Sequence, residues 1–241
     1  MIELKGICKK FGEVEILKGV DLKVADGETV ALMGPSGSGK SVLLKIVSGL
    51  IPPDKGEVII NGEKVTSSKR KMLDKIREHI GMVFQSNALF DSMNVFENIA
   101  FALRNIKGMN HDEIVRRVRE ALNMVKLGPI EFKQISELSG GMKKRVGIAR
   151  AIIANPRILL TDDPTAGLDP VTAQAILNLL KDLRTKFKSS GIVVTTAVNT
   201  ACQVADKIAF LYEGRIIEEG LLEKLKTSQH EPVKKFIESA S

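Results

Sequence analysis

Alternating apolar positions near the start of the chain predict strands with one buried face. Continuous apolar segments further along predict a sheet that helices cover. Apolar and polar positions alternate within residues 2–4 and 20–24, which is typical of strands with one buried face. Residues 58–60 are apolar and precede Asn61 and Gly62, a pair that favours a tight hairpin turn. We therefore predict a small antiparallel sheet in the first part of the chain.

Continuous apolar segments indicate a second sheet that is covered on both faces. The first segment, residues 29–33, leads into a glycine-rich turn and then into residues 42–47, which have the pattern of an amphipathic helix. Three further apolar strands are predicted at residues 158–160, 192–194 and 208–211. Strands that alternate with helices predict an α/β fold with a parallel sheet.

The middle of the chain has a helical pattern instead. Asn110 and Glu113 have the spacing of a capping box, and apolar residues then recur at helical intervals as far as Val125. We interpret this region as an insert within one domain over residues 1–241. The α/β core would consist of residues 1–90 and 155–241, and the helical subdomain of about 91–154.

Composition narrows the class of protein. The chain has 241 residues, 44% of them hydrophobic and 27% charged, which suits a folded domain and not a disordered tail. The net charge of +7 is compatible with phosphate-rich partners, although a mixed-charge surface also produces it. No stretch resembles a signal peptide or a membrane span, and the scattered cysteines and histidines predict neither a disulfide nor a zinc site.

The glycine-rich turn has the spacing of a phosphate-binding loop. It comprises Gly34, Pro35, Ser36, Gly37, Ser38, Gly39, Lys40 and Ser41. Glycines let backbone N–H groups face phosphate oxygens, and the N-terminus of the following helix favours an anion. Lys40 is expected to reach the β- and γ-phosphates, and Ser41 to ligate magnesium. A glycine-rich turn without a ligand is the alternative, but the strand before it and the helix after it favour a nucleoside triphosphate site.

Two carboxylates end the predicted strand at residues 158–160. Phosphoryl transfer needs one acidic group near the magnesium ion and another that orients the attacking water. Asp162 fits the first role and Asp163 the second. Paired aspartates before a proline are more often a turn or a helix cap, but together with the phosphate-binding loop they favour catalysis.

Together with Leu138-Ser-Gly-Gly-Met142, these motifs resemble the ATP-binding subunits of ABC transporters, in the family's order and over almost the whole chain. The resemblance implies an α/β P-loop NTPase core of the RecA-like kind, with a small antiparallel β subdomain and a helical insert. It also implies that ATP and Mg²⁺ are bound. Phe11 matches the aromatic residue that stacks on adenine, with a core aromatic as the alternative, and Gln85 matches the Q-loop glutamine that joins Ser41 and Asp162 around Mg²⁺.

The family's signature corresponds to Ser139, Gly140, Gly141 and Met142, and its D-loop aspartate to Asp169. Ser139 and the glycines would open a helix, so that its N-terminus forms a second anion site. In the family this signature completes the ATP site of the other subunit. The resemblance therefore implies a head-to-tail pair of two copies with two ATP molecules between them.

Membrane partners are implied as well. The family's members drive integral membrane permease subunits from the cytoplasmic face of the cell membrane, and the surface near Gln85 and residues 90–96 is the expected docking groove, with the core of the helical insert as the alternative. Residues 81–98 and Met142 are similar to the Mla- and Mce-associated lipid-transport ATPases. This implies phospholipid or other lipid cargo and a substrate-binding lipid carrier, although importers of amino acids or other small molecules differ by few residues.

Two positions depart from the family's pattern. Asp163 stands where most active members have glutamate, which shortens the reach by about 1.5 Å, and a shift of about 1 Å can cost about 100-fold in rate. Thr196 stands where a histidine contacts the γ-phosphate. We expect slow hydrolysis, and the alternatives are an ATP-dependent dimer with little turnover, which would act as a regulator, and a degenerate subunit.

Other classes of ATPase are disfavoured. Chromosome-organising relatives carry a long coiled coil between the phosphate-binding loop and the signature, and translation-associated relatives carry two cassettes, so no nucleic-acid partner is expected. The basic amphipathic tail, residues 221–241, is expected to pack against the body or a second subunit, with an anionic membrane as the alternative.

Overall fold

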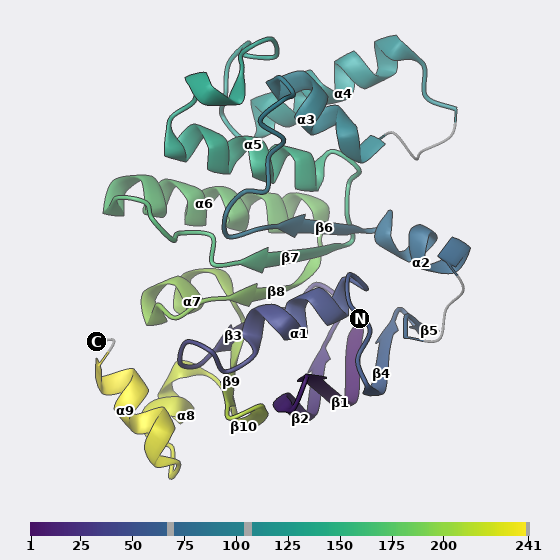
Figure 1. The fold of residues 1–241 in the computed structure, drawn as a ribbon. Helices are drawn as coiled ribbons and strands as arrows, with labels where there is room; N and C mark the ends of the chain where they lie inside the picture. The colour runs from purple at the N-terminus through teal and green to yellow at the C-terminus, as the bar shows by residue number, and fades with distance from the viewer. Residues whose placement is uncertain (67–69, 104–107, 240–241) are drawn as a thin grey trace.

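Two β-sheets and the helices around them form the frame of the protein (Figure 1). The computed structural model describes residues 1–66, 70–103 and 108–239. The smaller sheet is antiparallel with the order β2-β1-β4-β5. Its strands are β1 (Ile2–Phe11), β2 (Val14–Val24), β4 (Lys55–Ile60) and β5 (Glu63–Lys64). Asn61 and Gly62 connect the last two with φ angles of 50° and 84°, the conformation that this hairpin turn requires, so the predicted sheet and turn are confirmed.

The larger sheet has the order β10-β9-β3-β8-β7-β6. Its strands are β3 (Thr29–Met33), β6 (Ile80–Val83), β7 (Ile158–Asp162), β8 (Ser190–Val194), β9 (Lys207–Tyr212) and β10 (Arg215–Gly220). All neighbours are parallel except β10, which pairs antiparallel with β9 at the edge. Every residue of β3, β7 and β8 is buried, which confirms the predicted sheet covered on both faces.

Different helices cover the two faces of this sheet. The elements are α1 (Lys40–Val47), α2 (Arg70–Arg77), α3 (Val95–Ala100), α4 (His111–Met124), α5 (Gly140–Ile152), α6 (Pro170–Phe187), α7 (Val198–Val204), α8 (Leu222–Lys226) and α9 (Glu231–Ser239), with short 3₁₀ turns at Phe101–Leu103 and Ile135–Glu137. Val30 and Leu32 of β3 share a core with α1 and the small sheet. Ala31 and Met33 pack on the opposite face against α7, α8 and α9. Among the helices of the described ranges, none is both long and apolar enough to cross a membrane.

The predicted helical region contains α3, α4 and α5 (Figure 1). Asn110 caps α4 by accepting a hydrogen bond from the Glu113 N–H at 2.9 Å. The reciprocal bond of a capping box was predicted wrongly, because the Glu113 carboxylate is bound by Arg116 and Arg117 instead. A complete box occurs at the start of α3, where no box was predicted. Helix α5 shares its core with α6 and the sheet, and the boundaries given above for the helical subdomain remain a prediction.

The tail packs against the body, as expected. Leu225 of α8 and Val233 and Ile237 of α9 are buried in one core with Phe210 of β9. The Phe236 ring meets the Phe210 ring edge-on with centroids 5.1 Å apart. The apolar face of this basic stretch is therefore occupied within the chain.

A candidate nucleotide-binding site

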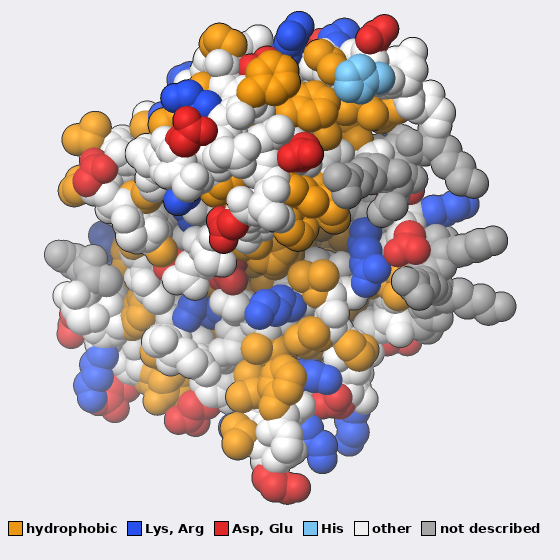
Figure 2. Space-filling model, turned by 45° about the horizontal axis from the view of Figure 1, so that its top comes forward, with side chains coloured by type: hydrophobic (Ala, Val, Ile, Leu, Met, Phe, Trp, Pro, Cys, Tyr) orange, Lys and Arg blue, Asp and Glu red, His pale blue; other side chains and the backbone are white. Residues whose placement is uncertain are grey.

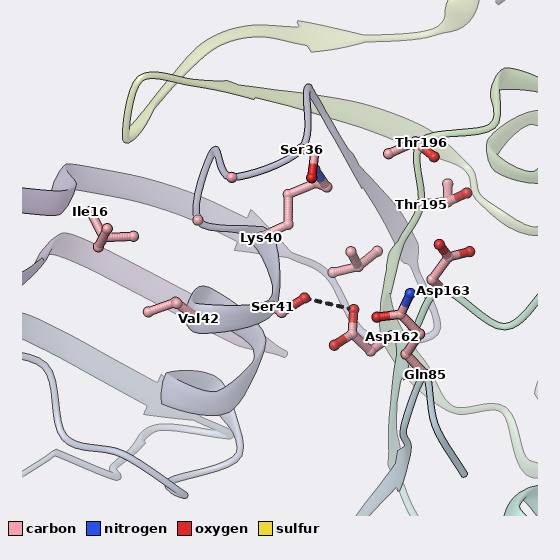
Figure 3. A pocket seen from close by; sticks show the side chains of 13 residues that line it. Ile16, Ser36, Lys40, Ser41, Val42, Gln85, Asp162, Asp163, Thr195 and Thr196 are labelled. Atoms are coloured by element: carbon pink, nitrogen blue, oxygen red, sulfur yellow. Dashed lines mark hydrogen bonds between the residues drawn. The ribbon is translucent and has the colours of Figure 1, made fainter. Parts of the chain in front are cut away.

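A pocket of about 380 Å³ gathers residues from separate parts of the sequence (Figure 3). It is lined by Ile16, Ser36, Gly37, Gly39, Lys40, Ser41, Val42, Gln85, Asp162, Asp163, Val194, Thr195 and Thr196. The loops after β3, β6, β7 and β8 supply most of these residues. Because these strands are parallel, their carboxyl ends meet at one edge of the sheet, which is where ligands of such folds bind.

The phosphate-binding loop requires glycine at two positions in particular. Gly34 has a φ of 142°, and a Cβ there would collide with the Leu211 carbonyl oxygen. Gly39 has a φ of 104°, and a Cβ there would lie 2.8 Å from the Leu17 side chain. The chain can therefore turn directly from β3 into α1, so that the first amides of α1 face the pocket.

Lys40 lies inside this loop and is 8% exposed. Its ammonium group donates to the carbonyl oxygens of Gly34 at 2.8 Å and Pro35 at 2.7 Å. Burial lowers the pKa of Lys40, and the carboxylates of Asp162 and Asp163 oppose this shift. The loop thus concentrates one cation and several N–H groups where a polyphosphate could bind.

Ser41 and Asp162 are joined by a hydrogen bond. The Ser41 hydroxyl donates to the Asp162 carboxylate at 3.0 Å, as the dashed line in Figure 3 marks. Gln85 follows β6 and lines the same pocket. Hydroxyl, carboxylate and amide oxygens are ligands that suit Mg²⁺, so these three residues fit a magnesium site.

Asp163 has an unusual backbone conformation with a φ of 40°. Its N–H donates to the Val194 carbonyl oxygen at 2.9 Å, which ties the ends of β7 and β8 together. Aspartate is among the residues that tolerate this left-handed conformation best. Burial and the Asp162 charge raise the pKa of Asp163, and Lys144 and Lys40 oppose that shift. A half-buried carboxylate with a raised pKa in a pocket is suited to accept a proton.

The loop after β8 carries Thr196 into the pocket (Figure 3). The neighbouring Thr195 is buried, and its hydroxyl accepts a hydrogen bond from the Ala197 N–H at 3.1 Å, which fixes the loop. Thr196 itself is exposed. The structure thus places Gln85, Asp162, Asp163 and Thr196 together with the phosphate-binding loop.

Other predicted residues lie outside this pocket. Phe11 ends β1 and is 51% exposed, which argues against the alternative of a core aromatic. Ser139 caps α5 by accepting from the Met142 N–H at 3.3 Å, so the signature residues Gly140 and Gly141 open a helix as predicted. Asp169 caps α6 in the same way by accepting from the Thr172 N–H at 2.9 Å.

The signature nevertheless lies against the beginning of α6. A Cβ on Gly141 would lie 2.8 Å from the Thr172 side chain of α6. The Thr172 side chain and the bond from the Thr172 N–H lower the pKa of Asp169, which keeps this cap ionised. The beginnings of α5 and α6 therefore form one surface apart from the pocket.

The predicted docking groove is only partly exposed. The rings of Phe90 and Phe101 lie 4.7 Å apart and are 39% and 38% exposed, whereas Phe96 packs against the core. Figure 2 shows hydrophobic side chains gathered in a hollow near the middle of the face that it presents. The alternative interpretation as core thus holds for Phe96 and not for Phe90.

Several residues of the site were not predicted from the sequence. Ile16 and Val42 line the pocket beside the phosphate-binding loop. Lys144 is 1% exposed and approaches the acidic pair from α5. A signal for Lys144 exists, because it precedes the apolar Ile148 by four residues and so lies on the buried face of its helix.

A phosphate-binding loop followed by a hydroxyl–carboxylate pair at the edge of a parallel sheet defines a P-loop NTPase. The model of the ABC transporter family matches residues 17–166. The chain therefore belongs to the ABC transporter family as an ATP-binding domain, and the resemblance stated above is confirmed.

Curated relatives are similar over almost the whole chain. It is 41% identical to Protein TRIGALACTOSYLDIACYLGLYCEROL 3, chloroplastic, from Arabidopsis thaliana, over 98% of this chain and 73% of that protein. It is 40% identical to the probable ribonucleotide transport ATP-binding protein mkl of Mycobacterium leprae, over 98% of this chain and 68% of that protein. The methionine import ATP-binding protein MetN of Brucella abortus is 40% identical over 97% of this chain, which spans only 63% of MetN.

Solved structures agree with this fold. The dimeric post-hydrolysis structure of the ATP-binding cassette MJ0796 bound to ADP and Pi superposes with a TM-score of 0.85 and 38% identity, over 92% of this chain and 99% of that chain. The cassette cbiO1 from Clostridium perfringens, part of the transporter complex cbiONQ, superposes with a TM-score of 0.82 and 30% identity, over 99% and 91%.

Proposed function

We propose that this chain is the ATP-hydrolysing subunit that powers a membrane ABC transporter. The convergence of Lys40, Ser41, Asp162 and Asp163 on one pocket is the observation that carries the proposal. The backbone amides of the loop and Lys40 bind the phosphates of ATP, and Phe11 stacks on its adenine. The Ser41 hydroxyl, the Asp162 carboxylate and the Gln85 amide hold Mg²⁺.

Hydrolysis then depends on the positions of the Asp163 carboxylate and the Thr196 hydroxyl. Mg²⁺ held by Ser41, Asp162 and Gln85 would neutralise the charge of the phosphates. Asp163 accepts a hydrogen bond from the attacking water and takes its proton, and the Thr196 hydroxyl donates to the γ-phosphate. Asp163 is shorter than the family's glutamate and a threonine hydroxyl reaches less far than an imidazole, so turnover is slow.

The active form is a head-to-tail pair of two copies. Ser139, Gly140, Gly141 and Met142 lie outside the pocket of their own chain, at the N-terminus of α5. A helix N-terminus attracts an anion, and a second copy can present its γ-phosphate there. The likeness to the dimeric cassette MJ0796 supports this arrangement, in which Asp169 lies at the contact between the copies.

The transported cargo is a phospholipid or another lipid moved across the bacterial envelope. The relative from Arabidopsis thaliana is named after a galactolipid, and residues 81–98 resemble lipid-transport ATPases. The chain would then act at the cytoplasmic face of the membrane with permease subunits and a lipid carrier, and the exposed Phe90 would contact a permease helix. The helical subdomain, about residues 91–154, would present the rest of that surface next to Phe90.

Co-purification with its permease tests this function. The complex in lipid nanodiscs should hydrolyse Mg-ATP faster than the isolated chain, and Asp163→Asn should stop turnover while leaving ATP affinity unchanged. Phospholipid should stimulate the complex, whereas methionine or ribonucleotides should not. Stimulation by methionine or ribonucleotides alone would replace the lipid cargo, and salt-sensitive binding of duplex DNA would contradict the absence of a nucleic-acid partner.

A low-turnover regulator is the second candidate, and Thr196 is the observation that favours it. In that case ATP would bind and the two copies would associate, but a permease would not raise the rate. Steady-state hydrolysis with and without the permease separates the two functions.

A further inference from the structure

One face of α5 packs on the loop that carries Gln85, residues 84–90, here called the Gln85 loop. The Lys144 ammonium group donates to the Gln85 carbonyl oxygen at 2.8 Å. Two turns further along α5, Arg150 donates from Nη1 to the Ala88 carbonyl oxygen and from Nη2 to that of Asn87, both at 2.7 Å. Two cations of one helix thus hold three main-chain carbonyls of the loop.

The part of the loop that Arg150 holds has a strained backbone. Asn87 and Ala88 have φ angles of 64° and 48°, in the left-handed region that residues other than glycine seldom adopt. Such conformations persist where the surroundings fix them. The flat guanidinium group of Arg150 bonds the carbonyls of these two residues through two separate nitrogens held in a rigid fork. Arg150 therefore stabilises the bend that follows Gln85.

Lys144 is the less expected of the two residues. It is 1% exposed, and burial lowers its pKa against the opposing charges of Asp163 and Asp162. An ammonium group out of water is costly unless it is hydrogen-bonded and paired, and an apolar side chain would fill the same space without that cost. The bond to the Gln85 carbonyl oxygen gives this lysine a role that an apolar residue lacks.

The far end of the Gln85 loop is tied to the same group of helices. Asn98 of α3 is fully buried, accepts a hydrogen bond from the Phe90 N–H at 2.8 Å and donates to the Phe90 carbonyl oxygen at 3.1 Å. The loop is thus bonded to α3 and α5 at both ends, while β6 joins it to the sheet through the chain. Gln85 lies between these two connections.

We infer that Lys144 and Arg150 are positioning residues that fix the Gln85 loop to the helix that begins at the signature, so that the place of the Gln85 amide relative to Asp162 depends on these two side chains. The three carbonyl contacts hold the main chain of the loop at Gln85, Asn87 and Ala88. This inference rests on the proposed function in one respect, because it takes Gln85 as a ligand of Mg²⁺.

Hydrogen exchange in the nucleotide-free chain tests the attachment itself. The N–H groups of Asn87 and Phe90 are protected by bonds to the Phe84 carbonyl oxygen and to Asn98. Lys144→Met and Arg150→Met should each raise the exchange rates of these amides by about tenfold or more, because they release the loop without unfolding the sheet. Unchanged rates in both variants would overturn the inference.

Arg145 of α5 provides the matched control. It donates to the Val125 carbonyl oxygen at 2.8 Å, so Arg145→Met removes the same kind of bond from the same helix but not from the Gln85 loop. It should leave the two amides unchanged, and an equal effect would overturn the inference. If Lys144→Met speeds exchange throughout the sheet, Arg150→Lys decides the matter, because it keeps the charge but loses the rigid two-nitrogen fork of the guanidinium group.

Turnover tests whether Lys144 acts through Gln85. Lys144→Met should lower kcat about tenfold in the wild type with little change in KM, and less than about twofold in a Gln85→Ala background. Lys144→Gln, which keeps a donor, should restore part of the loss. Equal losses in both backgrounds would overturn the inference. Absence of any turnover in the wild type would contradict the proposed function instead, and the exchange experiment would still decide this point.

Discussion

Restoring the family's side chains at Asp163 and Thr196 should accelerate ATP hydrolysis. Both residues line the nucleotide pocket, from the loops that follow β7 and β8. Asp163→Glu moves the carboxylate about 1.5 Å further into the pocket, and Thr196→His supplies an imidazole N–H in place of a short hydroxyl. Neither change touches the phosphate-binding loop.

The expected rise in kcat of the double variant can be given a lower and an upper limit. A catalytic group misplaced by about 1 Å costs about 100-fold, so we expect kcat to rise between about 10-fold and 100-fold in the double variant. At about 1.36 kcal/mol for each factor of ten, this is about 1.4–2.7 kcal/mol of transition-state stabilisation. The backbone opposes the change, because the φ of 40° at position 163 suits aspartate better than glutamate. A folding cost of about 1 kcal/mol would lower Tm by about 2–4 °C.

The assay measures steady-state Mg-ATP hydrolysis, with ATP affinity from calorimetry and Tm from calorimetric scans. Each single variant serves as a control, because Asp163→Glu alone should supply most of the gain. If the double variant binds ATP normally and its rate stays flat, then positions 163 and 196 do not have the roles assigned here. If the rate rises, the slow hydrolysis proposed for the wild type has its physical cause in these two side chains.

Three substitutions elsewhere in the chain test individual contacts. Lys40→Ala removes the cation from the phosphate-binding loop and should abolish Mg-ATP binding in calorimetry, and normal affinity would contradict the assignment of that loop. Asn98 is fully buried and forms four hydrogen bonds, so Asn98→Ala should reduce the free energy of unfolding in urea by about 2–4 kcal/mol, and an unchanged midpoint would show that these bonds contribute nothing. Hydrogen bonds from Arg116 and Arg117 lower the pKa of Glu113 to about 2. Because this value lies below the ordinary 4.5, the contribution of Glu113 to stability is present above pH 4.5 and lost as the pH falls toward 2, so the difference in Tm between wild type and Glu113→Gln should shrink over that range. A difference that stays constant with pH would refute this.

Much of the fold could be predicted from the sequence because its central strands are buried on both faces. The run Thr29–Met33 has the same bounds in the structure as in the prediction, and it is apolar because helices cover both sides. Strand β6 was not predicted, since four residues with a glycine give no clear period. Strand β10 contains Glu218 and Glu219, which hide an edge strand among polar residues. The capping box predicted at Asn110 is incomplete for a different reason. Arginines one turn further along the helix bind the Glu113 carboxylate, which the box would need.

The candidate site, too, could be predicted from the sequence only in part. Parallel strands bring their carboxyl ends together, so motifs that follow β3, β7 and β8 had to converge once the sheet was predicted, and they do. Residues that would act on a second copy, such as Ser139 and Asp169, cap helices away from the pocket, so the structure of one chain does not test that role.

Lys144 shows what lies beyond sequence reasoning. Its place on the buried face of α5 can be read from helical spacing, but a lysine there has no evident purpose in the sequence. Its hydrogen-bond acceptor is 59 residues away, on a loop after a strand that the pattern did not reveal. The spacing predicts burial, and only the packing of α5 on that loop shows why a cation, rather than an apolar side chain, is buried there.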